Sequence, residues 1–403
     1  MTSTLSVHHL LERHRHQFPA LANKAYFNYG GQGPMPQAAL AAMQQAHLHM
    51  QQAGPFSNSS NVWINQESQQ TRQTIAAELG VTAETITLTD SVSTGCNIAL
   101  WGIDWQPGDR ILMTDCEHQS IIAVVQEIQR RFGVAVDVCP LMATLNAGDP
   151  VAAIAQCLTA NTRLVVLSHI LWNTGQLLPL GEIVAACHAY PTQQHPVRVL
   201  VDAAQSVGVL PLDLAAIAVD FYAFTGHKWW CGPAGVGGLY VRPEALETLQ
   251  PTFIGWRGIT TDANGQPAGW ERGSKRFEVA TSDYALYPAL RVAIATQSEW
   301  GSVEARYQRI QTLSAYLWQQ LKELSSVHCL RTAPPEAGLV SFQVDQASER
   351  SHRQLAQFLE SQGLMVRTIL NPDCVRACVH YLTLESEIDR LVAGVQQFCQ
   401  TVG

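Results

Sequence analysis

Charged residues are scarce in this sequence. Only 14% of its 403 residues are Asp, Glu, Lys or Arg, whereas 47% are hydrophobic. A chain of this composition is too apolar for a disordered protein and long enough to bury a large core. It also has no run of basic residues, and its net charge is -8. We expect no nucleic-acid partner, because binding without sequence preference depends on clustered positive charge.

Metal-binding and membrane-spanning patterns are missing as well. The ten cysteines are scattered without a CxxC pair, so we predict no metal site. No uncharged apolar run reaches the ~18 residues of a membrane span, and residues 1–18 lack the apolar core of a secretory signal. We expect no membrane partner and a cytoplasmic location, since scattered cysteines suit a reducing compartment.

Short apolar strands alternate with helical stretches through the middle of the chain. Near-continuous apolar strands of this kind are typical of a mostly parallel sheet covered by helices on both faces. The predicted strands are Ile86–Thr89, Arg110–Thr114, Val134–Val138, Leu164–Ser168, Val197–Val201 and Asp220–Phe224.

The pattern changes near residue 283, where we predict a long helix over 288–324 followed by mixed strands and helices. The sequence therefore predicts a large α/β domain over 31–282 and a smaller α+β domain over 283–403. Residues 1–30 are expected to form an arm that packs on the smaller domain.

The most informative segment runs from residue 198 to residue 240. One apolar strand ends at Asp202-Ala203-Ala204-Gln205, and the next ends at Thr225-Gly226-His227-Lys228. Ligands of open α/β sheets bind beyond the carboxyl ends of the strands, where both clusters lie. An acid and a lysine there suit pyridoxal 5'-phosphate (PLP): the lysine forms a Schiff base, and the acid keeps the pyridine nitrogen protonated. Taken singly, each is better explained as a strand-end cap or a surface lysine, but their joint occurrence favours the cofactor.

The two clusters resemble the signature of the class V aminotransferases, the group that contains the cysteine desulfurases. Three further segments are similar to family motifs and occur in the family's order: a phosphate turn over 89–97, the pair Glu117-His118, and Phe277-Glu278-Val279-Ala280-Thr281. The resemblance spans residues 26–391 and is closest to the cysteine/cystine C–S lyases. It implies a PLP-dependent transferase of fold type I, with a mainly parallel, seven-stranded sheet in the large domain.

The resemblance implies a role for each residue around the cofactor ring. Lys228 would hold PLP covalently, Asp202 would pair with its pyridinium, and Gln205 would reach its phenolic oxygen. His118 would stack on the face of the ring, although a buried structural histidine is the alternative. Lys228 and His118 are therefore the catalytic candidates.

A second group of residues is expected at the cofactor phosphate. Ser93 and Thr94 would bind it together with backbone N–H groups of the turn, although an ordinary helix cap explains both residues equally well. Thr225 and His227 would add contacts. The family threonine that matches Thr281 reaches the phosphate of the partner subunit, so the resemblance implies a homodimer with shared active sites.

One position aligns with the family in two ways, and another departs from its pattern. Asn173 is expected near the cofactor oxygen, but the family residue aligns with either Trp172 or Asn173. Ala280 stands where the family motif has glycine, which alters the shape expected of that loop.

Substrate binding is assigned to two arginines near the C-terminus. Arg376 resembles the family arginine that binds the α-carboxylate, a group that a bidentate guanidinium suits. Arg367 is expected to bind the same carboxylate or the far end of a larger substrate, and a surface ion pair explains it equally well. Cysteine desulfurases carry a reactive cysteine on a mobile loop between these positions, which here are only nine apart. We expect Cys374, in the shortened loop, not to reach the substrate sulfur, and a displaced nucleophile is the alternative.

Without that nucleophile, sulfur must leave by another route. We predict a PLP-dependent C–S lyase that β-eliminates cystine, cysteine or a related S-substituted cysteine to pyruvate, ammonia and a persulfide or sulfide. Its product would supply a sulfur acceptor in iron–sulfur cluster assembly. An amino-acid epimerase of the isopenicillin-N type, an aminotransferase, and a catalytically inert sulfur carrier or scaffold are the alternatives.

Overall fold

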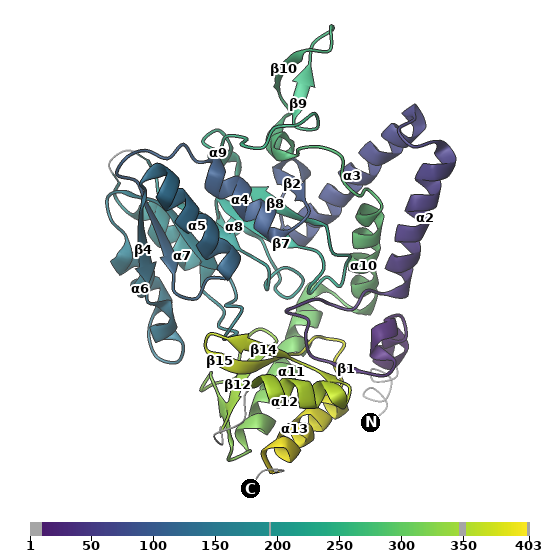
Figure 1. Cartoon of the computed structure of the whole chain (residues 1–403), viewed down its shortest axis with the longest axis vertical. Coiled ribbons are helices and arrows are strands. Elements are labelled where there is room, and N and C mark those ends of the chain that lie inside the picture. The colour runs from purple at the N-terminus through teal and green to yellow at the C-terminus, as the bar shows by residue number, and fades with distance from the viewer. Residues whose placement is uncertain (1–9, 193–194, 346–351, 401–403) are drawn as a thin grey trace.

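The computed structural model of this chain describes residues 10–192, 195–345 and 352–400. Figure 1 shows a larger upper part, in which helices surround a central sheet, and a smaller lower part with a second sheet. A two-stranded hairpin, β9 (Ile259–Thr261) and β10 (Pro267–Trp270), projects from the top of the upper part. None of the helices in the described ranges combines the length and apolar character needed to cross a bilayer.

The central sheet has seven strands in the order β2-β8-β7-β6-β5-β3-β4. The five strands from β7 to β4 are parallel, and β8 is antiparallel to both of its neighbours. The mainly parallel, seven-stranded sheet expected from the sequence is confirmed. Its strands are β2 (Ile86–Thr89), β3 (Arg110–Thr114), β4 (Ala135–Cys139), β5 (Thr162–Ser168), β6 (Arg198–Asp202), β7 (Phe221–Thr225) and β8 (Gly237–Val241).

Helices cover both faces of this sheet, as the apolar strands predict. Side chains of successive residues in a strand point to opposite faces. In β5, Val165 and Leu167 belong to one hydrophobic core, whereas Leu164 and Val166 belong to another. The helices of this part are α2 (Gln37–Ala53), α3 (Asn58–Leu79), α4 (Val92–Gly102), α5 (Gln119–Phe132), α6 (Pro150–Cys157), α7 (Leu180–Ala189), α8 (Leu214–Ile217), α9 (Pro243–Leu246) and α10 (Leu286–Trp300). The 3-10 turns are η1 (Pro19–Leu21), η2 (Ala83–Thr85), η3 (Leu141–Thr144) and η4 (Gly273–Phe277).

The lower part is built on an antiparallel sheet in the order β11-β12-β15-β14. A separate pair of short parallel strands joins β1, near the N-terminus, to β13. Arg15 also forms an ion pair of 2.7 Å with Glu387, so the N-terminal residues contact this part of the molecule. Its elements are β1 (Ala25–Tyr26), α11 (Val303–Lys322), β11 (Val327–Cys329), β12 (Leu339–Val344), α12 (His352–Ser361), β13 (Leu364–Met365), β14 (Arg367–Leu370), β15 (Asp373–Cys378) and α13 (Glu385–Gln400).

The single long helix expected over 288–324 is wrong, because the structure has two helices there. The chain is extended at Gly301, and the Ser302 hydroxyl then accepts a hydrogen bond from the N–H of Ala305 to cap α11. The first helix, α10, lies beside α2 and α3 (Figure 1) and adds Leu290 and Ile294 to a core of the seven-stranded sheet. The domain boundary after residue 282 stays a prediction, but the packing of the upper part continues beyond it.

Candidate active site

Asp202 and Lys228 follow neighbouring parallel strands, so their positions at the carboxyl edge of the sheet are adjacent. Asp202 is the last residue of β6, is 7% exposed and accepts a hydrogen bond of 2.9 Å from the N–H of Ala204. Lys228 lies in the turn after β7. Burial lowers the pKa of its amine to about 8, an effect that the charge of Asp202 opposes and those of Arg376 and Arg367 reinforce. At pH 7 about a tenth of this amine is therefore neutral, and the neutral form is the one that forms a Schiff base.

The N-terminal loop lies directly over these strand ends. The amide of Gln205 donates to the carbonyl of Gly30 at 2.9 Å, and its oxygen accepts from the indole N–H of Trp229 at 2.9 Å. A Cβ on Gly33 would lie 2.1 Å from the carbonyl oxygen of Lys228. Only glycine permits this approach, so the loop closes one side of the site. Gln205 keeps a second amide hydrogen, and its contact with the cofactor stays a prediction.

His118 lies at the start of α5 and is exposed. Its Nδ1 accepts from the N–H of Ser120, and its ring packs edge-on against Trp172 at 5.2 Å. Partial burial lowers its pKa, with Asp202 raising it and Lys228 and two arginines lowering it further. A neutral, exposed ring is available to pack against a planar ligand.

Behind His118, Glu117 is buried and faces the sheet. It accepts hydrogen bonds from the hydroxyl of Thr114 and from both the N–H and the hydroxyl of Ser168. Burial nevertheless raises the pKa of Glu117 to about 8. These contacts tie the ends of β3 and β5 together and hold the turn that carries His118.

Ser93 and Thr94 lie in the first turn of α4, as expected. The residue that caps this helix is Ser91, whose hydroxyl accepts from the N–H of Thr94 at 3.2 Å. The hydroxyl of Thr94 donates to Asp90, so it must leave that carboxylate before it can donate to a phosphate. The helix N-terminus itself presents backbone N–H groups suited to an anion.

Thr225 and His227 face each other on the other side of the site. The hydroxyl of Thr225 lies 2.7 Å from Nδ1 of His227. Burial and the neighbouring Lys228 lower the pKa of His227 to about 4. The imidazole is therefore neutral. Its Nδ1 is engaged by the hydroxyl of Thr225.

A cavity of about 660 Å³ joins the phosphate turn to the segment after η4. Ser93 and Thr94 line it from α4, and Thr281 lines it from the other side. Thr281 and Ala280 are both exposed. Thr281 thus lies by the cavity of its own chain, and the expected contact with a partner's phosphate stays a prediction.

Arg367 and Arg376 are directly paired across the hairpin of β14 and β15. Opposite residues of an antiparallel pair carry their side chains on the same face, so both arginine side chains leave the hairpin on one side. Arg376 is 2% exposed and donates to the carbonyl of Trp172, whereas Arg367 is exposed. Two adjacent positive charges favour binding of carboxylates.

Asn173 lies between the two parts of the molecule. Its amide donates to the carbonyl of Asn371 at 3.2 Å, and its own carbonyl accepts from Ser341 at 2.7 Å. Its side-chain Oδ1 is buried and has no hydrogen-bond partner within the described structure. An unpartnered buried acceptor fits a site that is completed by a ligand.

Cys374 lies on β15, two residues before Arg376. The side chain is fully buried, and burial raises the pKa of its thiol to about 12 even though Arg376 lowers it. The thiolate is the nucleophilic form of cysteine. Cys374 is therefore held as an unreactive thiol, in agreement with the expectation from the shortened loop.

The charges of Asp202, Lys228, Arg367 and Arg376 all act on His118, so these five residues lie near one another, whereas Ser93, Thr94 and Thr281 line the cavity beside the phosphate turn. An amine of lowered pKa, a carboxylate at the next strand end, hydroxyls at a helix N-terminus and paired arginines fit PLP and an amino-acid substrate. Within the described ranges, no cluster of His, Cys, Asp or Glu is arranged to hold a metal ion. The sequence analysis did not assign Gly30 and Gly33 to the site. The glycine-rich loop that contains them is the feature of the sequence that could have indicated their role.

Two solved structures of the protein C-DES are 53% identical to this chain. One is a lysine-to-alanine mutant with glycine covalently linked to the PLP cofactor; its TM-score is 0.93, and the match covers 95% of this chain and 98% of that one. The other is a complex of the cystine C–S lyase C-DES with its reaction product cysteine persulfide, with a TM-score of 0.92 and coverage of 94% and 99%.

More distant relatives and a family model agree with this likeness. A cysteine desulfurase of Klebsiella pneumoniae (strain 342) is 28% identical over 418 residues, covering 98% of this chain and 99% of the relative. Isopenicillin N epimerase of Streptomyces clavuligerus is 27% identical over 381 residues, covering 90% and 92%. The model of the aminotransferase class-V family matches residues 25–391. The chain therefore belongs to the class V aminotransferase family and is a PLP-dependent enzyme of fold type I.

Proposed function

We propose that this enzyme is a carbon–sulfur lyase that β-eliminates cystine or a related cysteine derivative. The observation that carries the proposal is the short β14–β15 hairpin. It pairs Arg367 with Arg376 and buries Cys374 beside them, so the site has two carboxylate-binding groups and no thiol nucleophile from this loop. Cystine has two carboxylates, and C-DES, at 53% identity, is a cystine C–S lyase.

Each residue around the reacting atoms has a defined task. Arg376 binds the α-carboxylate, and Arg367 binds the carboxylate at the far end of cystine. PLP, when bound, supplies the electron sink for the negative charge that develops at Cα. Lys228 removes the Cα proton, and the Cβ–S bond breaks with the electron pair leaving on sulfur. Cystine and water then give pyruvate, ammonia and cysteine persulfide, so atoms and charge balance.

The remaining site residues hold the cofactor. Asp202 would keep the pyridine nitrogen protonated, Gln205 and Asn173 would bind the phenolic oxygen, and His118 would stack on the ring. Three hydroxyls and one imidazole would bind the phosphate. These are Ser93, Thr94, Thr225 and His227.

We also propose that the enzyme is a homodimer in which Thr281 reaches the partner's cofactor. Phe253 and Trp256, which are 76% and 54% exposed, lie in the segment before the projecting hairpin. Large exposed apolar side chains near a site commonly mark an interface. We further propose that the persulfide passes to a sulfur acceptor for iron–sulfur assembly in the cytoplasm. The ten free cysteines support a reducing compartment.

The experiment is to mix the purified enzyme with cystine and follow pyruvate, alanine, persulfide and the cofactor spectrum together. β-Elimination predicts equal amounts of pyruvate and persulfide, and Lys228→Ala abolishes both. Alanine without pyruvate would instead indicate desulfuration and would refute the proposal. Inversion at Cα without loss of sulfur would favour an epimerase, and turnover that requires a 2-oxo acid would favour an aminotransferase.

A further inference from the structure

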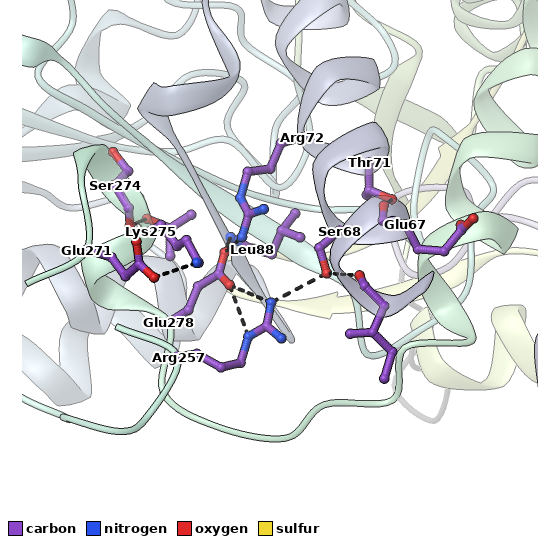
Figure 2. Close-up of polar contacts among 12 residues, drawn as sticks. Glu67, Ser68, Thr71, Arg72, Leu88, Arg257, Glu271, Ser274, Lys275 and Glu278 are labelled. Carbon is purple, nitrogen blue, oxygen red and sulfur yellow. Dashed lines mark hydrogen bonds and ion pairs between the residues drawn. The ribbon is translucent and has the colours of Figure 1, made fainter. Parts of the chain in front are cut away.

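A buried ion cluster lies beside the phosphate turn and outside the set of residues assigned above. At its centre is Glu278, 5% exposed, which is shared by two arginines from different elements (Figure 2). Arg257 donates to Oε2 of Glu278 at 3.1 and 3.3 Å, and Arg72 of α3 donates to Oε1. The backbone N–H of Leu88 also donates to Oε1, at 3.1 Å.

Glu278 is the acceptor that holds this cluster together. The other hydrogen bonds of the Arg257 guanidinium among the described residues go to neutral hydroxyls, those of Ser68 and Tyr284, each at 3.4 Å. Burial lowers the pKa of Arg257, but the charges of Glu278 and two tyrosines outweigh this effect and leave the pKa raised. Removing one partner of a buried ion pair leaves the other charge uncompensated, so the positions of both arginines depend on Glu278.

Three segments that border the cofactor site meet at this carboxylate. Leu88 belongs to β2, directly before the turn that leads to Ser93 and Thr94. Glu278 itself begins the segment that carries Thr281, and both residues line the cavity with the phosphate turn. Arg257 lies 5.7 Å from the ring of the exposed Trp256. A shift of Glu278 would therefore move the turn and the facing segment relative to each other.

We propose that Glu278 is a positioning residue for the cofactor phosphate. Through the N–H of Leu88 it fixes the end of β2, and through Arg72 and Arg257 it anchors the Thr281 segment against α3. The positions of the phosphate turn and of the Thr281 segment then both depend on one buried carboxylate. This inference rests on the proposed phosphate contacts of Ser93 and Thr94, and does not depend on which reaction the enzyme catalyses.

The test compares PLP with pyridoxal, which lacks the phosphate, as ligands of the full-length apoenzyme. Glu278→Gln keeps the size of the side chain but removes the charge that holds both arginines. We expect PLP affinity to fall about tenfold or more, while pyridoxal affinity changes less than twofold. The ratio of the two dissociation constants, measured by absorbance titration, is a readout that general loosening of the fold would leave unchanged.

Controls separate this role from others. Glu271→Gln removes a carboxylate that pairs with Lys275 at 2.7 Å on the neighbouring segment (Figure 2) and should leave both affinities unchanged. Equal losses of PLP and pyridoxal affinity in Glu278→Gln would show a merely structural role. A gain in PLP affinity would show that net positive charge, rather than position, governs binding. Either result overturns the inference.

Two further variants keep the test decisive. If Glu278→Gln does not fold, Arg257→Lys retains the charge but loses the two-nitrogen contact, and the same selective loss is expected at smaller size. Ser93→Ala tests the phosphate site itself. If Ser93→Ala leaves the PLP-to-pyridoxal ratio unchanged, the phosphate assignment fails. If Ser93→Ala lowers the preference for PLP and Glu278→Gln does not, only the role of Glu278 is refuted.

Discussion

Replacing Arg367 by alanine tests whether the site is built for a substrate with two carboxylates. The structure pairs Arg367 with Arg376 across one hairpin, but Arg376 is buried and Arg367 is exposed. A hydrogen bond to a charged group contributes about 1.5–3 kcal/mol, which corresponds to about 10–150-fold in affinity. Because water screens the exposed guanidinium, its contribution lies at the lower end of this range.

We therefore expect Arg367→Ala to lower kcat/KM for cystine by about tenfold. The same variant should change kcat/KM for S-methylcysteine, which has a single carboxylate, by less than about twofold. Arg376→Ala should impair both substrates, and by more, because the buried guanidinium binds the carboxylate that they share. Pyruvate formation measured over a range of substrate concentrations provides these values.

A matched control is Arg390→Ala, which removes an exposed arginine from α13. It should leave both substrates unaffected. Equal losses on cystine and S-methylcysteine in Arg367→Ala would refute the reasoning, because Arg367 would then act on the shared part of the substrate. No loss on either would make Arg367 an ordinary surface residue.

Three other substitutions or conditions test the site. Gly30→Ala places a Cβ 2.8 Å from Nη2 of Arg376, so we expect KM for cystine to rise more than kcat falls, as steady-state kinetics would show. In the apoenzyme, Lys228 is protonated below its lowered pKa of about 8 and neutral above it; its labelling by an amine-specific reagent should rise with a midpoint near pH 8, and a midpoint near pH 10 would contradict the effect of burial. Cys374→Ala should retain pyruvate formation within about twofold because this thiol is buried and protonated at neutral pH, and a larger loss of pyruvate formation would show that the thiol takes part in the reaction.

Local sequence patterns were sufficient to predict much of the fold. Each expected strand of the central sheet lies within two residues of its observed bounds, because apolar runs between polar turns depend on neighbours in sequence. The clusters that end at Asp202 and Lys228 are equally local, and adjacent parallel strands bring them together automatically. The sequence did not reveal the end of α10, because alanine, leucine and glutamine, which favour helices, occur on both sides of Gly301. The only local sign of a new helix is Ser302, the single serine that caps α11.

The sequence by itself determined the cofactor, the family and the type of sheet, since these follow from short motifs in a fixed order. Only the tertiary structure decided which side chains are buried and which are paired. Cys374 became unreactive through burial, and Arg367 and Arg376 became neighbours through strand register. Arg72 and Glu278 are 206 positions apart in sequence. Contacts of this kind depend on packing between distant segments, which no local pattern encodes.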